Sequence, residues 1–152
     1  MNGRIQMTNY LAGIYIAANT VSVEERTLPT VGPKDVLLKN LRGGICGTDI
    51  NIVKYGSEMG IRFEHEFGHE LAGVVEEVGA DVTDIKPGMF VTVNPITAKR
   101  AGRRYCLEVG GFSQYVLIED AALDYNLFKR YFFIMKEINA TLYFHKSRFL
   151  VD

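Results

Sequence analysis

The chain has 152 residues, of which 47% are hydrophobic and 23% are charged. This length suits one globular domain that buries roughly 68 to 70% of the surface of its unfolded chain. Lys and Arg total 17, Asp and Glu total 18, and the formal net charge is −1, which disfavours nucleic-acid binding through bulk positive charge. No segment approaches the ~18 consecutive apolar residues of a membrane span. We therefore expect no nucleic acid and no membrane among its partners.

The cysteine content points to a reducing compartment. Cys46 and Cys106 are the two cysteines of the chain, too few for a disulfide framework. Cys46 also lies in a motif that needs a free thiolate. The apolar stretch at 11–18 lacks a convincing cleavage site for a secretory signal, and we interpret it as a strand. The sequence thus favours a cytoplasmic location.

About the first ninety residues alternate short β-branched runs with turn residues, a spacing typical of an all-β barrel or sandwich. Pro and Gly mark the chain reversals, as at Lys86-Pro87-Gly88. One short helix is predicted over Thr48–Tyr55, with Thr48 or Asp49 as its N-cap. The predicted strands are Leu11–Ala17, Val21–Glu25, Val36–Leu41, Leu71–Val78, Phe90–Val93 and Phe112–Ile118.

Beyond Asn94 the alternation is lost, and a loop is predicted over 96–110. Its basic residues are Lys99, Arg100, Arg103 and Arg104. Such a cluster could hold a phosphate, but a solvated basic turn explains it more simply. The segment from Tyr125 onward is rich in Phe and Tyr. Its periodicity does not distinguish between a helix, a pair of strands and an adhesive apolar surface over 131–144.

Potential metal ligands occur in two glycine-rich segments. Cys46 lies within Gly-Gly-Ile-Cys-Gly-Thr-Asp at 43–49, and His69 and Glu70 lie within Phe-Gly-His-Glu-Leu-Ala-Gly at 67–73. Cys, His and carboxylate are ligands of zinc, and three protein ligands leave a fourth position open for water or substrate. The flanking glycines would let the two segments turn sharply and approach each other. Taken singly, each residue is more simply a buried cysteine or a core histidine.

Several motifs in this order resemble the N-terminal catalytic domain of the zinc-dependent medium-chain alcohol and polyol dehydrogenases. The resemblance runs from about Ile14 to Lys129 and implies a mainly β fold, a GroES-like β-barrel with one or two short helices, over residues 1–129. The matching segments are Gly44–Asp49, Gly68–Val75, Val78-Gly79, Val82, Lys86–Gly88, Val91 and Gly110–Val116.

The resemblance also implies roles for individual residues. Cys46 and His69 match the ligands of one catalytic zinc ion, and Glu70 matches a carboxylate that is a ligand in polyol-type members and lies near the metal in others. Thr48 matches the hydroxyl that relays the alcohol proton, although a plain helix cap is equally compatible with its position. The implied catalytic residues are thus Thr48, Cys46 and His69, and the implied substrate is a small alcohol or polyol.

Two departures from the family pattern limit the expected activity. Many members carry four cysteines for a structural zinc, whereas 96–109 contains only Cys106, so this second site is excluded. Members also bind NAD(P) through a Rossmann domain with a Gly-x-Gly-x-x-Gly turn. No two glycines here are separated by one residue, and about two dozen residues follow Lys129, too few for a βαβ unit. No NAD(P)-binding residues are predicted.

The last residues, 130–152, are predicted to form a tail. Within it, Met135–Leu142 faintly resembles the segment by which full-length members return from the Rossmann domain to the barrel, and an unrelated amphipathic tail is the alternative. We therefore predict a catalytic-domain fragment with a zinc site that is inactive alone in NAD-linked oxidation, because the hydride acceptor is not oriented.

Two alternative functions also fit parts of the sequence. His65-Glu66-Phe67-Gly68-His69 fits the His-Glu-x-x-His pattern of zinc peptidases, but that pattern requires a helix, and its glycines and the following β-branched alternation favour a strand. We interpret His65 as a loop residue near the metal pocket. The second alternative is a non-catalytic barrel that self-associates, since exposed apolar patches tend to find partners. A homo-oligomer is therefore predicted.

Overall fold

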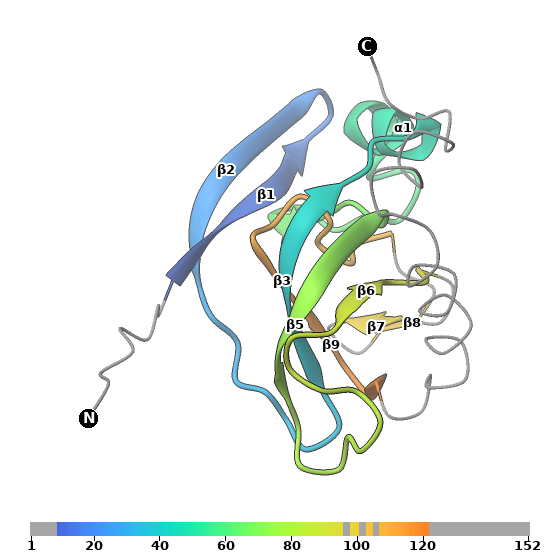
Figure 1. Ribbon diagram of the computed structural model, residues 1–152. Helices are drawn as coiled ribbons and strands as arrows, with labels where there is room; N and C mark the ends of the chain where they lie inside the picture. Colours follow the sequence, from blue (N-terminus) through green and yellow to red (C-terminus); the bar gives the residue numbers. More distant parts are fainter. Residues whose placement is uncertain (1–8, 96–97, 101–102, 105–106, 122–152) are drawn as a thin grey trace.

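The computed structural model describes residues 9–95, 98–100, 103–104 and 107–121 and is built mostly of antiparallel strands (Figure 1). This confirms the predicted mainly β class. The elements of the described residues are β1 (Asn9–Ala17), β2 (Thr20–Thr27), β3 (Val36–Gly43), α1 (Gly47–Tyr55), β4 (His65–Glu66), β5 (Leu71–Val78), β6 (Phe90–Thr92), β7 (Lys99–Arg100), β8 (Arg103–Arg104) and β9 (Tyr115–Ile118). Among them, no helix has the length and apolar character that crossing a membrane requires.

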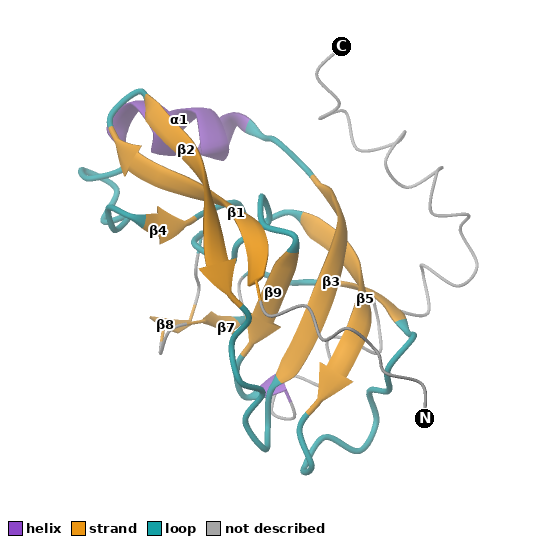
Figure 2. Ribbon diagram, turned by 90° about the vertical axis from the view of Figure 1, so that its left-hand side faces the viewer, coloured by secondary structure: helices purple, strands orange, loops and turns teal. Residues whose placement is uncertain are grey.

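The strands form two main sheets (Figure 2). The first has the order β2-β1-β4, and the second has the order β6-β5-β3-β9. A short pair, β7-β8, forms a third sheet. The β1–β2 hairpin turns at Asn19, which has a φ of 60°, a conformation that Asn tolerates better than most residues.

Strand β3 lies at the centre of the core because both of its faces are covered. Leu37 packs with Tyr10, Ile14 and Tyr115, which come from β1 and β9. Leu38 points to the opposite face, as successive residues of a strand do. It belongs to a cluster of aliphatic side chains from the second sheet and its loops: Val36, Leu38, Leu71, Val75, Val82, Ile85, Val91, Val93, Ala98, Val109, Val116, Ile118 and Ala121. The two clusters cover the two faces of β3.

Two predicted boundaries were wrong. The helix begins at Gly47 with Cys46 as its N-cap residue, rather than with Thr48 or Asp49 in that position. The strand predicted from Phe112 begins only at Tyr115. The residues before it form a turn, because the backbone N–H groups of Gly110 and Gly111 both bond to the Gly68 carbonyl oxygen at 3.0 Å.

Two segments predicted as loops contain short strands. β7 and β8 pair antiparallel within the predicted loop 96–110, with Lys99 opposite Arg104 and Arg100 opposite Arg103. His65 is not a loop residue but belongs to β4, where it pairs with Tyr15 of β1. The sequence predictions for Cys106 and for the tail 130–152 lie outside the described residues.

Candidate metal site

Antiparallel pairing of β3 and β5 brings the two glycine-rich segments together. Gly43, the last residue of β3, is opposite Leu71, the first residue of β5. The chain continues from β3 to Cys46 and enters β5 from His69 and Glu70, so the potential ligands meet beside this strand pair. The Gly44 N–H donates to the Glu70 carbonyl oxygen at 2.8 Å and closes the junction.

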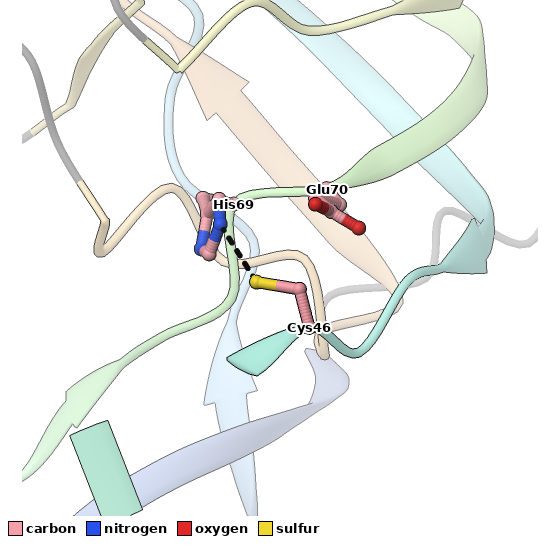
Figure 3. A group of neighbouring side chains, drawn as sticks. All are labelled: Cys46, His69 and Glu70. Carbon is pink, nitrogen blue, oxygen red and sulfur yellow. Dashed lines mark hydrogen bonds between the residues drawn. The ribbon is translucent and has the colours of Figure 1, made fainter. Parts of the chain in front are cut away.

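The side chains of Cys46, His69 and Glu70 converge on one point (Figure 3). Cys46 Sγ lies 3.4 Å from His69 Nε2, and the potential ligand atoms of the three residues lie within 4.8 Å of one another. His69 is buried, whereas Cys46 and Glu70 are partly buried. The predicted ligand set is therefore assembled in the structure, with one side still open to solvent.

Two glycines are required by this packing. A Cβ atom on Gly44 would lie 2.6 Å from Oε2 of Glu70, so a side chain there would displace the carboxylate. Gly68 has a φ of +89°, and a Cβ atom on it would lie 2.8 Å from the Phe112 ring. Residues with a Cβ rarely adopt this backbone conformation. The glycines thus permit the close approach that the sequence suggested.

Asp49 connects the two halves of the site. Its side chain is 2% exposed. One carboxylate oxygen, Oδ2, accepts a hydrogen bond from the Cys46 backbone N–H at 2.8 Å. The other, Oδ1, lies 3.4 Å from Nδ1 of His69, longer than an ordinary N–H···O hydrogen bond. Neither Oδ1 nor Nδ1 has a hydrogen-bond partner within the described part of the chain, so their mutual attraction is electrostatic.

The two groups shift each other's pKa. Burial by itself raises the pKa of the Asp49 carboxyl, but the nearby His69 ring and the Cys46 N–H outweigh burial and bring the pKa below its ordinary value. The Asp49 carboxylate raises the pKa of His69 against the opposing effect of burial, and the charge of Glu70 adds to the increase. Asp49 is therefore an anion that holds Nδ1 of His69 and leaves Nε2 facing Cys46.

The sequence pointed to Asp49 only as a helix cap. Its position three residues after Cys46 is that of a capping-box acid, which bonds back to the N-cap backbone N–H. A carboxylate on the second nitrogen of a metal-binding histidine is also a general feature of such sites. The first role could be inferred from spacing, but the second depends on where His69 lies in space.

The donor atoms fit a zinc ion. A tetrahedral zinc with Zn–S of ~2.3 Å and Zn–N of ~2.0 Å holds its sulfur and nitrogen donors about 3.5 Å apart. The observed separation of Cys46 Sγ and His69 Nε2 is 3.4 Å. Thiolate, imidazole and carboxylate are all zinc ligands, and three of them leave a fourth position for a small molecule.

The remaining predicted residues lie at the margin of this cluster. Thr48 is partly buried in the first turn of α1, two residues after Cys46, and its role stays a prediction. His65 is exposed and is not part of the cluster. His65 and Glu66 form a strand, so the helical arrangement on which the zinc-peptidase pattern depends is absent from this part of the described chain.

Comparison with curated proteins gives relatives of one kind. L-threonine 3-dehydrogenase from Streptomyces avermitilis is 37% identical over 110 residues, which cover 61% of this chain and 32% of that protein. Human sorbitol dehydrogenase is 33% identical over 100 residues, which cover 64% of this chain and 28% of that protein. The match thus spans about a third of the length of these relatives.

Solved structures show the same similarity. A protein from Sinorhizobium meliloti 1021 described as a zinc-binding dehydrogenase, bound to NADP, superposes with a TM-score of 0.63 at 31% identity, over 75% of this chain and 37% of that one. 2R,3R-butanediol dehydrogenase from Bacillus subtilis has a TM-score of 0.62 at 26% identity, over 74% and 39%.

A family match covers most of the described residues. Residues 32–125 match the alcohol dehydrogenase GroES-like domain. This segment includes Cys46, His69 and Glu70, and both main sheets contribute strands to it. The chain therefore belongs to the zinc-dependent medium-chain alcohol dehydrogenase family, to whose N-terminal GroES-like domain it corresponds.

Proposed function

We propose that this chain provides the catalytic zinc site of an alcohol or polyol dehydrogenase, with Cys46, His69 and Glu70 as the ligands of one zinc ion. The observation that carries the proposal is the convergence of these three side chains within 4.8 Å. Their chemistry supports zinc, because zinc binds thiolate and imidazole ligands well, whereas magnesium and calcium prefer oxygen ligands. We also propose that the catalytic domain spans residues 1–129 and that residues 130–152 form a separate tail.

The residues of the chain have distinct tasks in the proposed reaction. Asp49 fixes the ring of His69 so that Nε2 faces the metal, and its second oxygen holds the backbone of Cys46. Zinc supplies a Lewis acid that lowers the pKa of a hydroxyl group in the open position. Thr48, in the first turn of α1, would relay the proton that the alcohol loses, because its hydroxyl oxygen can accept that proton as the hydroxyl passes its own proton to solvent water. The partial burial of the cluster strengthens these electrostatic effects, because less water screens them.

The substrate class follows from the relatives. Sorbitol dehydrogenase and 2R,3R-butanediol dehydrogenase are named for polyhydroxy compounds, and L-threonine 3-dehydrogenase for a hydroxy amino acid. We propose a small alcohol or polyol for this chain as well. Cys46 and Glu70 are partly buried and not fully enclosed, which suits a neutral hydroxyl compound that enters from solvent.

The hydride acceptor is the limiting component. The 152 residues contain no Gly-x-Gly-x-x-Gly sequence, the turn that places a dinucleotide pyrophosphate at a helix N-terminus. We propose that these residues bind zinc but do not orient NAD(P), and that they are inactive alone in NAD-linked oxidation. A reducing, cytoplasmic location suits the free thiol of Cys46.

Self-association is a second proposal, supported by the surface near Cys46. Leu41, Ile45 and Ile50 flank it in sequence and are each more than two-fifths exposed. Exposed apolar groups of this size favour association, so we propose a homo-oligomer. Sedimentation velocity over a range of concentrations checks it, and a concentration-independent monomer would contradict it.

Metal analysis tests the main proposal. Protein prepared with zinc available should contain about one zinc ion per chain. Cys46→Ala should lose this ion, because the remaining imidazole and carboxylate bind zinc weakly without the thiolate. Zinc retained in Cys46→Ala would contradict the ligand assignment. In a separate titration, saturable NADH binding would contradict the proposed lack of cofactor orientation.

A further inference from the structure

Asn40 of β3 lies outside the metal cluster. It contacts the turn 110–114, which packs against the segment that carries His69. Its side-chain Nδ2 donates to the Gly111 carbonyl oxygen at 2.7 Å and to the Ser113 carbonyl oxygen at 3.0 Å. Since both neighbours are acceptors, the atom between them must be the amide nitrogen. The Asn40 backbone N–H also donates to the Gln114 carbonyl oxygen at 2.8 Å. Asn40 therefore ties β3 to the turn 110–114.

That turn packs directly on the backbone of the ligand segment. The N–H groups of Gly110 and Gly111 donate to the Gly68 carbonyl oxygen at 3.0 Å. A Cβ atom on Gly111 would lie 3.1 Å from the carbonyl carbon of Gly68 and 3.3 Å from the backbone nitrogen of His69. Gly111 thus lies against the residues that present His69 and Glu70.

The same glycine contacts the strand that leads to Cys46. A Cβ atom on Gly43 would lie 2.5 Å from the Gly111 carbonyl oxygen, the oxygen that Asn40 also holds. Gly111 is therefore wedged between the end of β3 and the segment before β5. A shift of this turn away from β3 would therefore change the position of Gly111 relative to both Cys46 and His69.

We infer that Asn40 is a positioning residue that sets the separation of the two halves of the metal site through Gly111. Hydrogen bonding does not satisfy the whole side chain, because the buried Oδ1 of Asn40 has no hydrogen-bond partner among the described residues. An unpaired buried acceptor is unfavourable. The two bonds from Nδ2 offset that cost and fix the turn. This inference rests on the proposed zinc site.

Cobalt(II) titration of the full 152-residue chain tests the inference, because bound cobalt reports thiolate coordination through its absorption spectrum. Asn40→Leu keeps the volume of the side chain and removes both donors. We expect it to weaken cobalt binding about tenfold, the lower end of the range for residues that orient metal ligands, and to change the cobalt spectrum. Val36→Ala, in the same strand but remote from the turn, is the control: it lowers the melting temperature and leaves the spectrum unchanged.

The outcomes separate this inference from the proposed function. Wild-type affinity and spectrum in a folded Asn40→Leu variant would overturn the role of Asn40 and leave the zinc site intact. An equal loss of affinity in Val36→Ala would overturn it too, because the effect would then follow stability. Failure of the wild-type chain to bind cobalt would overturn the zinc site and this inference together.

A second variant covers the case in which Asn40→Leu does not fold. Asn40→Asp keeps the shape and replaces the donor by an acceptor, and its added negative charge by itself favours binding of a dication. Weaker cobalt binding in Asn40→Asp would therefore support the role of the two hydrogen bonds. Unchanged or tighter binding would overturn it.

Discussion

Two histidines four residues apart have opposite surroundings. His65 lies in β4 of the first sheet, pairs with Tyr15 across the strand and is exposed. His69 lies where β3 and β5 meet in the second sheet, is 8% exposed and faces both Cys46 and Asp49. Their spacing in the sequence suggests one shared metal site, but the fold places His65 in a strand of the first sheet and His69 just before β5 of the second. Location at a strand junction, rather than motif spacing, determines which histidine can act as a ligand.

The largest expected effect contrasts these two histidines. His69→Ala should abolish stoichiometric zinc binding, because it removes a buried ligand and leaves Asp49 without its partner. His65→Ala, the matched control, should retain about one zinc per chain. Metal analysis after gel filtration measures both. Loss of zinc in both variants would contradict the comparison and restore the peptidase arrangement, in which both histidines are ligands.

A smaller effect is expected one step further from the metal. Asp49→Asn keeps the size of the side chain but removes the charge that holds Nδ1 of His69, so zinc affinity should fall by about 10- to 100-fold. Competition with a chromophoric chelator gives the affinity. Asp120→Asn, a carboxylate remote from the cluster, should leave it unchanged. Equal affinity of Asp49→Asn and the wild type would show that His69 needs no partner.

How much of this site could be predicted depends on the kind of contact. Short apolar runs between turn residues predicted β3 and β5 closely, because both strands contribute side chains to the core, and their glycine-rich ends identified Cys46 and His69. Strand β4 could not be predicted, since two residues carry no periodicity and the strand exists only by pairing with β1.

Other features of the site could not be predicted, because they depend on contacts with residues that are distant in the sequence. The turn before β9 reads as strand in sequence, and only its bonds to Gly68 explain why pairing begins at Tyr115. Asp49 reads as a cap, and Asn40 carries no signal at all, because an isolated polar residue in a strand is ordinarily a solvent-facing one. Their tasks depend on atoms that are distant in the chain and that only the fold brings near.

Replacing glycines of positive φ should have an intermediate effect, which is on the free energy of unfolding. Gly68→Ala should destabilise the fold by about 1–2 kcal/mol from backbone strain alone, and more because the new methyl group meets the Phe112 ring. Gly88→Ala is the control: its φ is +88°, but a Cβ atom there meets nothing within 4 Å, so only the strain should remain. Urea unfolding of the metal-free proteins compares them. Equal losses would mean that the Phe112 ring moves aside freely.

The smallest effect should be confined to the first sheet. The Tyr10 hydroxyl donates to Oε1 of the buried Glu66, so Tyr10→Phe should cost about 0.5–1.5 kcal/mol as this one hydrogen bond is lost. Zinc affinity should stay at the wild-type value, because Glu66 lies in β4 and outside the metal cluster. Urea unfolding and chelator competition on the same samples separate the two quantities. A parallel fall in zinc affinity would show that the first sheet also supports His69, and the contrast between the two histidines would then be one of degree.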